Sequence, residues 1–307
     1  MLYYLGIDGG GSKTTCAVGD ETRLLATATA GPSNIVRCGE EQARQSLIQA
    51  VRQACAACAI TPDQVVSTCI GGAGAARPEL AAIVRSILAE ILSSPIDVVG
   101  DMETSLEAAF GDGPGVIVIA GTGSIAFGRD NAGKTLRAGG WGFEIGDEGS
   151  AHWIGRSAIS AVLRASDLHG DRVLSSVLAQ SLFKAWGVRS LLDLARAANS
   201  IPPPDFAALL PAVVNSGDDL AREVLAHAGR ELSQLATVVI QRLFPEDLLE
   251  CVPVAMIGGV FRHAAGVRDA FYNELKISAP RAQVLPNVVD PVDGALRMAR
   301  KAAGIRS

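Results

Sequence analysis

Two glycine-rich turns in the sequence carry hydroxyl side chains among closely spaced backbone N–H groups. They span residues 9–14 and 121–124. Glycine backbone can approach phosphate oxygens without Cβ atoms in the way, and Lys13 adds an ammonium group to the first turn. Each turn alone also fits an ordinary hairpin, but two such turns favour a phosphate chain that is held from both sides. The residues predicted to bind phosphate are Gly10, Gly11, Ser12, Lys13, Thr14, Thr122 and Gly123.

Two aspartates stand at the ends of short apolar runs that read as strands. Asp8 comes directly before the first turn, where its carboxylate is suited to hold Mg²⁺ through a water molecule. Asp101 follows the strand predicted over 96–99, in a position suited to a general base. Transfer of a phosphoryl group to a sugar hydroxyl requires such a base to accept the proton. An aspartate at the start of a helix is also a common N-cap, and the two roles can coexist.

The most distinctive segment spans residues 139–155 and places acidic side chains among glycines and tryptophans. Carboxylates hydrogen-bond to hydroxyl groups and an indole ring covers an apolar face, so this mixture suits a sugar. The plainer interpretation is a surface loop in which Asp147 or Glu148 caps a helix that starts at Ser150. Near the C-terminus, the glycines at 258–259 follow an apolar strand and would let a flat adenine approach the backbone, although a plain strand-to-helix turn is equally compatible.

The elements that must position these residues alternate between strands and helices. Short apolar runs predict strands, and apolar residues at helical spacing predict helices, most clearly after Pro78. This alternation favours an α/β domain whose ligand lies beyond the strand ends. The pattern of strand, turn and strand recurs with Gly123 in the place of Gly11, an offset of 112 residues. We interpret it as a duplication in which two related domains each aim a glycine turn at a shared cleft.

Composition narrows the class of protein. The 307 residues suffice for two domains, and 19% charged against 49% hydrophobic residues exclude intrinsic disorder. A net charge of −5 without a basic run argues against a nucleic-acid partner. No stretch reaches the roughly 18 to 20 apolar residues of a membrane span, and the N-terminus lacks the features of a signal peptide, so we expect a cytoplasmic protein with no membrane partner. The C-x-x-C pair Cys55 and Cys58 is interpreted as two core residues one helical turn apart.

The order of these motifs resembles that of the N-acetylglucosamine kinase branch of the BadF/BadG/BcrA/BcrD ATPase family. The resemblance extends from residue 5 to about 300. The motifs that carry it are Gly6–Thr14, Gly31–Asn34, Gly100–Asp101, Ala120–Ser124, Gly139–Gly142, Gly146–Ser150 and Ile257–Gly259. Among them, the block from Gly139 to Ser150 is specific, whereas each of the others would be weak alone.

The resemblance implies an α/β fold of the actin-like ATPase type, with two RNase H-like domains around a central cleft. The N-terminal domain would span residues 1–113, carry the first phosphate loop on the sugar side and be joined by the C-terminal helix 291–307. The C-terminal domain would span residues 114–290 and carry the second phosphate loop and the adenosine site.

The resemblance also implies roles for single residues. Ser12 and Thr122 would contact the ATP phosphates, and Gly258 and Gly259 would lie near the adenosine. Asp101 would take the proton from the sugar 6-hydroxyl as the phosphoryl group is transferred. The implied sugar contacts are Asn34, Asp101, Ser124, Gly140, Trp141 and Asp147. ATP and Mg²⁺ would be the cofactors, N-acetylglucosamine the substrate and a homodimer the expected assembly.

Three alternatives remain at the level of sequence. Glucosamine could be the acceptor in the same chemistry, since the residues that would contact an N-acetyl group cannot be assigned. An iron–sulfur activator of an acyl-CoA dehydratase or reductase shares the implied fold, but it needs cysteines beside the second turn, and residues 118–125 contain none. A sugar sensor or an actin-like assembly protein would not require Asp101 together with both phosphate turns. The glycines at 71–74 have no assigned role.

Overall fold

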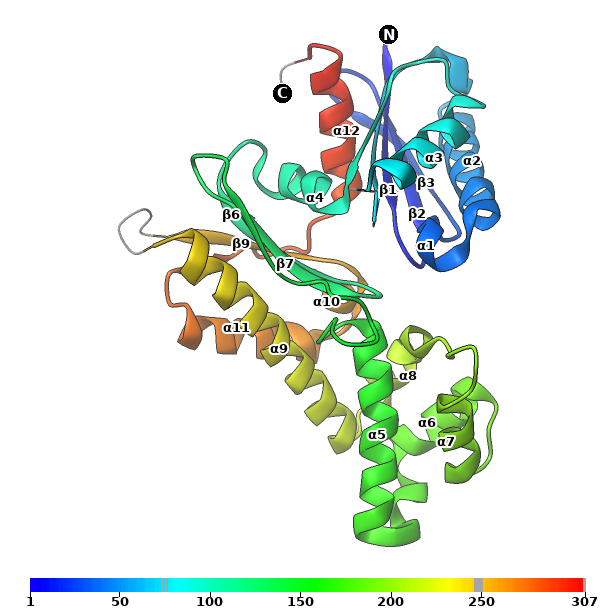
Figure 1. The fold of residues 1–307 in the computed structure, drawn as a ribbon, viewed down its shortest axis with the longest axis vertical. Coiled ribbons are helices and arrows are strands. Elements are labelled where there is room, and N and C mark those ends of the chain that lie inside the picture. The colour runs from blue at the N-terminus through cyan, green and yellow to red at the C-terminus, as the bar shows by residue number, and fades with distance from the viewer. Residues whose placement is uncertain (73, 76, 246–250, 306–307) are drawn as a thin grey trace. The chain divides into compact units, whose positions relative to one another are not determined.

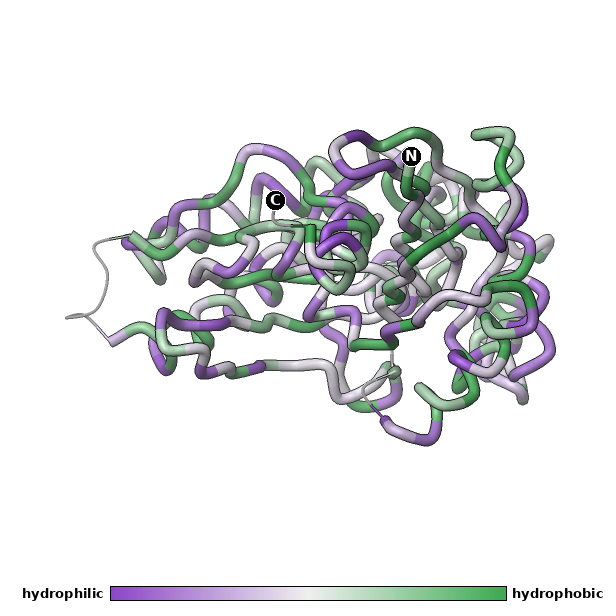
Figure 2. Tube along the Cα trace, turned by 90° about the horizontal axis from the view of Figure 1, so that it is seen from above, coloured by the Kyte–Doolittle hydropathy of each residue, from purple (hydrophilic) through white to green (hydrophobic). Residues whose placement is uncertain are grey.

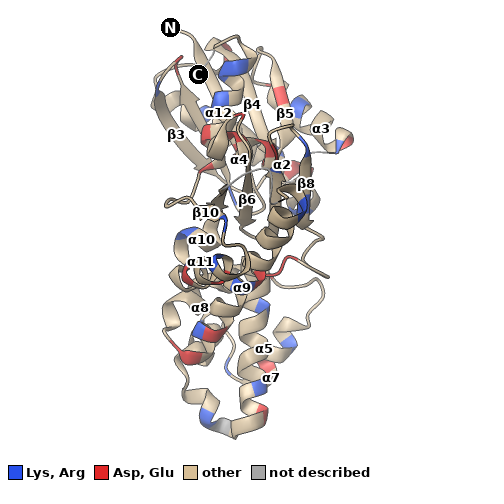
Figure 3. Ribbon diagram, turned by 90° about the vertical axis from the view of Figure 1, so that its left-hand side faces the viewer, with Lys and Arg blue, Asp and Glu red and all other residues tan. Residues whose placement is uncertain are grey.

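The computed structural model describes residues 1–72, 74–75, 77–245 and 251–305. The chain divides into two compact units, one formed by Met1–Gly113 with Val289–Ser307 and the other by Pro114–Val288. Each unit holds one five-stranded sheet and the helices that cover it (Figure 1). No helix among the described residues is long and apolar enough to cross a membrane. Basic and acidic residues are scattered over the ribbon instead of gathering on one element (Figure 3).

The first unit has the strand order β3-β2-β1-β4-β5. Its first three strands form an antiparallel meander, and β4 and β5 extend the sheet parallel to β1. Its elements are β1 (Tyr3–Gly9), β2 (Thr14–Gly19), β3 (Leu24–Ala30), α1 (Ile35–Cys38), α2 (Glu40–Ala57), β4 (Val65–Gly72), α3 (Pro78–Ala89), β5 (Ile96–Gly100), α4 (Asp101–Phe110) and α12 (Pro291–Ala302), with a short 3-10 helix at Pro62–Gln64.

The second unit repeats this topology, with the strand order β10-β9-β6-β7-β8. An antiparallel meander again comes first, and β9 and β10 extend the sheet parallel to β6. Its elements are β6 (Gly115–Ala120), β7 (Ser124–Arg129), β8 (Thr135–Gly139), α5 (Ala151–His169), α6 (Val177–Trp186), α7 (Leu191–Ala198), α8 (Leu210–Ser216), α9 (Asp219–Leu243), β9 (Val252–Ile257), α10 (Gly259–His263), α11 (Ala265–Ser278) and β10 (Ala282–Val284), with 3-10 helices at Gly170–Ser175 and Phe206–Leu209.

The shared topology confirms the predicted fold class of two α/β domains of the RNase H-like type. The two hairpin turns differ in length, however. Four residues separate the paired Gly9 and Thr14, whereas three separate the paired Ala120 and Ser124. The repeat between the two units is therefore one of topology, and a gapless alignment through the turn does not describe it.

The sheet of the first unit separates two apolar cores. Strand side chains alternate between its faces, so Leu5 and Ile7 pack with α2 and α3 while Tyr4 packs with α12. Figure 1 shows these two helix pairs, α2 with α3 and α4 with α12, on opposite sides of the strands. The helix α12 lies so close to β1 that a Cβ atom on Gly6 would come within 2.7 Å of the Leu296 Cα atom.

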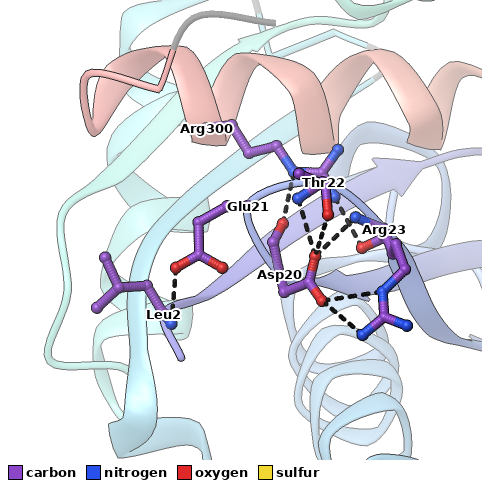
Figure 4. A network of polar contacts seen from close by, with 6 residues as sticks. All are labelled: Leu2, Asp20, Glu21, Thr22, Arg23 and Arg300. Carbon is purple, nitrogen blue, oxygen red and sulfur yellow. Dashed lines mark hydrogen bonds and ion pairs between the residues drawn. The ribbon is translucent and has the colours of Figure 1, made fainter.

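Arg300 fastens α12 to the turn between β2 and β3 (Figure 4). Its guanidinium donates to the backbone oxygens of Asp20 and Arg23, each at 2.8 Å. The Asp20 carboxylate in turn accepts from the backbone N–H groups of Thr22 and Arg23 at 2.8 and 2.7 Å. These hydrogen bonds lower the pKa of Asp20 to about 2. The C-terminal helix is thus tied to the N-terminal meander by polar contacts as well as by packing.

The core of the second unit lies between its sheet and a layer of amphipathic helices. The helix α9 packs on β6, β7 and β8 and against α11. Hydrophilic and hydrophobic residues alternate over short stretches of the trace (Figure 2). Asp218 caps α9 by accepting from the Leu220 N–H group at 3.0 Å, and it also accepts from the N–H group of Leu178 in α6 at 3.3 Å.

Candidate functional site

In the first unit, three glycines lie in one row at the carboxyl ends of the parallel strands. Gly9 pairs with Gly72, and Gly72 pairs with Gly100. Asp8 precedes this row on β1, and Asp101 follows it as the first residue of α4. The sheet register therefore brings together the two aspartates that the sequence places 93 residues apart. This edge is where ligands bind in open α/β sheets.

The first turn is joined to the segment that follows β3. Within the turn, the Gly10 N–H group donates to the Lys13 oxygen at 2.9 Å. The Gly10 oxygen then accepts from the N–H groups of Ser33 and Asn34 at 3.1 and 3.2 Å. The Asn34 side-chain oxygen caps α1 by accepting from Val36 at 3.1 Å, so its amide NH₂ group is the part left for a ligand. These hydrogen bonds fix the position of Asn34, a predicted sugar contact, relative to the predicted phosphate loop.

The exposure of the side chains in the first turn differs sharply. Ser12 and Lys13 are exposed, as a phosphate contact requires. Thr14 is fully buried, and its hydroxyl bonds to the Gly31 oxygen at 2.8 Å and to the Ser33 hydroxyl at 2.7 Å. The Thr14 hydroxyl therefore holds the turn to the segment after β3, and a phosphate contact of Thr14 through its backbone stays a prediction.

Asp101 is positioned by the close packing of α4. A Cβ atom on Gly71 would lie within 2.7 Å of the Thr104 Cγ2 atom, and one on Gly294 of α12 would lie within 2.6 Å of the Ala108 nitrogen. The N-cap position of α4 is Gly100, whose N–H group donates to the Glu103 carboxylate at 2.5 Å. Asp101 is therefore the first residue of the helix and not its N-cap, although its carboxylate accepts from its own N–H group and from that of Met102.

The carboxyl groups near this edge disfavour one another's ionisation. Burial, together with the nearby carboxylates of Asp101 and Asp290, raises the pKa of Asp8 to about 7, while Lys13 lowers it. Burial also raises the pKa of Asp101, against hydrogen bonds from its own N–H group and that of Met102. A raised pKa brings a carboxylate closer to the range in which a general base works at neutral pH.

The residues present fit a magnesium ion that is held mostly by water and phosphate. Among the residues that the structure describes, no group of three or more His, Cys, Asp or Glu side chains could hold a metal ion. Mg²⁺ commonly keeps several waters and takes one or two carboxylates, with the remaining ligands from substrate phosphates. A carboxylate whose ionisation is disfavoured by burial and by like charges, as that of Asp8 is, gains from a nearby cation.

In the second unit, the second turn is fixed by three contacts. The Gly121 N–H group donates to the Gly123 oxygen at 2.9 Å, and the Gly121 oxygen accepts from Ala151 at the start of α5 at 2.8 Å. Gly258, at φ 101°, packs directly on the turn, because a Cβ atom there would lie within 2.7 Å of the Ala120 carbonyl carbon. Thr122, predicted to contact phosphate, is partly exposed.

Asp147 joins the second turn to the glycine-rich loop. Its buried carboxylate accepts from the backbone N–H groups of Ser124 and Gly142, and burial raises its pKa. Gly123 makes room for it, since a Cβ atom there would lie 2.7 Å from an Asp147 carboxylate oxygen. Asp147 has a φ of 60°, an unusual value for a residue other than glycine that is often found at functional sites.

The other predicted sugar contacts of the second unit differ in exposure. The Ser124 hydroxyl is buried and donates to the backbone oxygen of Glu148 at 2.7 Å. It can therefore offer a ligand only a lone pair. Trp141 is 67% exposed, and the Arg137 guanidinium lies 4.6 Å from the centre of its ring. Gly140 has a φ of 70° and packs against the side chain of Ile125.

The helix α5, which follows this loop, is not capped by Asp147 or Glu148, as the plainer interpretation of the sequence would require. Ser150 is the N-cap of α5, and its hydroxyl accepts from the Trp153 N–H group at 3.2 Å. Neither Asp147 nor Glu148 occupies that position. The acidic residues are thus not explained by helix capping. His152, in the first turn of α5, is buried between the rings of Phe143 and Phe206.

The two glycines that follow β9 have different surroundings. The backbone approach of Gly258 to the second turn explains that glycine without a ligand. Around Gly259 the nearest atom to an added Cβ would be in the His263 ring at 4.0 Å, which leaves space for a ligand. The predicted adenosine contact is therefore better supported at Gly259 than at Gly258.

Sequence reasoning missed Thr104 and Ser33, which help to build the site. Thr104 occupies the space that Gly71 leaves, and Ser33 bonds to Thr14 behind the first turn. The sequence held a signal for the Thr104 contact. The glycines at 71–72 end a predicted strand without an assigned role, and such glycines indicate the close approach of another element. The buried Cys55 and partly buried Cys58 lie with Cys16 in the core of the first unit, in agreement with their interpretation as core residues.

Known proteins resemble this chain over nearly its whole length. The model of the BadF/BadG/BcrA/BcrD ATPase family matches residues 5–298. An N-acetylmuramic acid/N-acetylglucosamine kinase of Clostridium acetobutylicum is 32% identical over 98% of this chain and 99% of its own. An N-acetyl-D-glucosamine kinase of Dictyostelium discoideum is 30% identical over 96% and 97%. A solved structure from Chromobacterium violaceum, with N-acetylglucosamine kinase as its suggested activity, superposes with a TM-score of 0.76 at 25% identity over 97% and 99%.

Proposed function

The chain belongs to the BadF/BadG/BcrA/BcrD ATPase family, and we propose that it is a kinase that transfers the γ-phosphate of ATP to the 6-hydroxyl of N-acetylglucosamine. The observation that carries this proposal is the position of Asp101 at the carboxyl edge of the sheet, directly after the row of Gly9, Gly72 and Gly100 that Asp8 directly precedes. The two full-length curated relatives carry kinase names, and both named substrates bear an N-acetyl group.

In the proposed reaction, Asp101 accepts the proton of the sugar 6-hydroxyl as its oxygen attacks the γ-phosphorus. The bond from that phosphorus to the β,γ-bridging oxygen breaks, and ADP leaves. The raised pKa of Asp101 suits a group that must take a proton and later release it. Positioning and charge stabilisation supply most of the catalysis in phosphoryl transfer, so the base adds to what the two turns provide.

The nucleotide is proposed to bind through both glycine turns. Backbone N–H groups at 10–11, with Ser12 and Lys13, would hold phosphate oxygens in the first unit. In the second unit, Thr122 and Gly123 would do the same, and the open space at Gly259 would take part of the adenosine. Asp8 would hold Mg²⁺ through water. The ion would supply positive charge to the transferring phosphoryl group.

The sugar is proposed to contact polar groups that the fold already holds in place. The Asn34 amide and the Asp101 carboxylate would bind hydroxyls from the first unit. The exposed ring of Trp141, Gly140 and the Asp147 carboxylate would contribute from the second. The Ser124 hydroxyl, already donating to Glu148, would act mainly by holding the loop.

Glucosamine with the same mechanism is the second candidate acceptor. An acyl-CoA dehydratase or reductase activator remains the more distant one, and the absence of cysteine from residues 118–125 counts against it. A cytoplasmic location and a homodimer stay predictions, which cell fractionation and light scattering of the purified protein would test.

The decisive experiment measures ADP release with a panel of sugars, for the wild type and for Asp101→Asn. We expect strong stimulation by an amino sugar, and a loss of about 10²- to 10⁴-fold in the variant with nucleotide binding retained. Asp97→Asn, which changes an exposed aspartate on β5, the strand directly before Asp101, is the matched control. Equal ADP release with and without sugar would refute the proposed kinase activity. Unchanged turnover in Asp101→Asn would refute only the role of Asp101 as the general base.

A further inference from the structure

The buried hydroxyl of Ser33 lies between two segments that are proposed to bind different substrates. The first turn, at residues 9–14, is proposed to hold ATP phosphates, and Asn34 is proposed to contact the sugar. Ser33 directly precedes Asn34 and is only 7% exposed, so its side chain is turned towards the protein interior. The contacts of Ser33 decide whether the two binding segments are independent of each other.

Hydrogen bonds connect Gly31, Thr14 and Ser33 in a short chain. The Thr14 hydroxyl oxygen lies 2.8 Å from the Gly31 oxygen and 2.7 Å from the Ser33 hydroxyl oxygen. A hydroxyl group has one hydrogen, whereas a carbonyl oxygen can only accept. The Thr14 hydrogen therefore serves Gly31, and the Ser33 hydrogen serves Thr14. Because the hydroxyls of Thr14 and Ser33 are shielded from water, each bond of this chain strengthens the other.

The backbone at Ser33 is also bonded to the first turn. The N–H groups of Ser33 and Asn34 both donate to the Gly10 oxygen, at 3.1 and 3.2 Å. The Ser33 hydroxyl packs on Gly9 as well, since a Cβ atom on that glycine would lie 2.9 Å from the hydroxyl oxygen. A change in the first turn that accompanies phosphate binding is therefore transmitted to Ser33 through its backbone and its side chain.

The orientation of the Asn34 amide depends on the same segment. The Asn34 side-chain oxygen accepts from the Val36 N–H group at 3.1 Å. Its backbone oxygen accepts from the N–H groups of Arg37 and Cys38, each at 2.9 Å. These bonds fix the direction of the amide relative to α1, so a displacement at Ser33 displaces the group that is proposed to meet the sugar.

We propose that Ser33 is a positioning residue that couples the two segments, so that nucleotide and sugar each bind more tightly in the presence of the other. The inference rests on the proposed function and deepens it, because it concerns how one site brings its two substrates together. Bound phosphate restricts the first turn and, through Ser33, the segment of Asn34, which leaves less motion for the sugar to restrict. Coupling of this kind is reciprocal and commonly amounts to about 5- to 150-fold in affinity.

The first test measures the Kd of N-acetylglucosamine by calorimetry, with and without Mg²⁺ and the non-hydrolysable ATP analogue AMP-PNP. The ratio of the two Kd values is the coupling factor, and we expect at least about fivefold in the wild type. Ser33→Ala should lower this factor by about 2- to 12-fold, which corresponds to the loss of one neutral hydrogen bond. A residue that serves stability alone would change the melting temperature and leave the factor unaltered.

Ser46→Ala is the matched control for this test. Ser46 is a buried serine of α2 beside Gly31, but its hydroxyl donates to the Gln42 oxygen of its own helix at 2.9 Å. We expect its coupling factor to equal that of the wild type. An equal fall of the factor in Ser33→Ala and Ser46→Ala would overturn the proposal, as would no fall in Ser33→Ala.

The second test asks whether Ser33 acts through Thr14. Thr14→Val keeps the shape of the side chain and removes its hydroxyl, so it should lower the coupling factor as Ser33→Ala does. Residues of one hydrogen-bonded network are not additive, and the double variant should therefore lower the factor no further than the stronger single variant. Fully additive effects would contradict this route of coupling.

A third measurement uses the wild-type protein and does not depend on the folding of a variant. AMP-PNP with Mg²⁺, in the absence of sugar, should slow amide hydrogen exchange at Ser33, Asn34 and Val36. Protection that ends at residue 14 would refute the coupling.

The outcomes separate this inference from the proposed function. If no sugar stimulates ADP release from the wild type, the proposed kinase activity fails, and the role of Ser33 fails with it. If the sugar is phosphorylated but its Kd does not respond to AMP-PNP, or responds equally in the wild type and in Ser33→Ala, only the role of Ser33 is refuted.

Discussion

Gly71 of β4 and Thr104 of α4 are in such close contact that a Cβ atom on the glycine would lie within 2.7 Å of the threonine Cγ2 atom. On its other side, α4 meets Gly294 of α12 with equally little space. The helix that begins with Asp101 is thus held between a strand and the C-terminal helix. Its position, and with it that of the proposed base, depends on two glycines distant in sequence.

Gly71→Ala should therefore displace α4 and lower both stability and activity. Overpacking a well-packed core costs about 1 to 3 kcal/mol, and a shift of about 1 Å at a catalytic group can cost 10²-fold in rate. Thermal unfolding and kcat should be measured in parallel. The double variant Gly71→Ala/Thr104→Ala should recover part of both losses, because it removes the side-chain atoms that clash. Full activity in Gly71→Ala would show that α4 does not depend on this contact.

Asp8→Asn should stabilise the ligand-free protein at alkaline pH. Asp8 has a pKa of about 7 in the folded protein and about 3.9 when unfolded. The folded state therefore binds more protons between these values, and the contribution of Asp8 to stability falls as the pH rises from about 4 to 7. At about 1.4 kcal/mol per pKa unit, the ionised Asp8 carboxylate lowers the free energy of unfolding by up to about 4 kcal/mol at pH 8.

The measurement is the melting temperature of Asp8→Asn and the wild type from pH 4 to 8. The melting temperature of Asp8→Asn should exceed that of the wild type most at pH 8, and the difference should shrink towards pH 4. The variant should also lose ATP-dependent activity. Asp269→Asn, which changes an exposed aspartate on α11, is the control and should show little gain at any pH. A gain that does not vary with pH would contradict the electrostatic explanation.

Asp147→Asn should loosen the junction between the second turn and the glycine-rich loop. Asparagine adopts a φ of 60° at least as readily as aspartate, so the change isolates the loss of charge. Hydrogen bonds to a charged acceptor contribute about 1.5 to 3 kcal/mol, against about 0.5 to 1.5 for neutral pairs. Amide hydrogen exchange should therefore accelerate at Ser124 and Gly142, the two donors. Unchanged exchange at both positions would exclude this role for the carboxylate.

Gly258→Ala and Gly259→Ala form a matched pair at neighbouring positions. Alanine at 258 would meet the Ala120 carbonyl group at a φ of 101°, so we expect a loss of about 1 to 3 kcal/mol from strain. Alanine at 259 meets nothing closer than 4.0 Å and should leave the melting temperature nearly unchanged. A weaker affinity of Gly259→Ala for ATP would support the adenosine contact. Equal destabilisation by both changes would refute the packing argument.

Most of the elements that carry the site could be predicted from sequence. The apolar runs before Asp8 and Asp101 and the helical spacing after Pro78 correspond to β1, β5 and α3. The short strands β8 and β10 and the helices α6, α7 and α8 were not predicted, because short or partly exposed elements have little periodic signal. Those helices lie between residues 168 and 252, a segment that carries none of the motifs of the family resemblance.

The sequence by itself determined which local structures form, since turn chemistry and apolar periodicity depend on near neighbours. It therefore identified the glycine turns and the aspartates that precede or follow strand ends. Only the tertiary structure decided which groups can meet a ligand. Sheet register set Gly9, Gly72 and Gly100 in one row, and long-range packing buried the hydroxyl of Thr14 while leaving that of Ser12 near the surface. Such pairings depend on contacts between residues far apart in the chain, which local patterns do not encode.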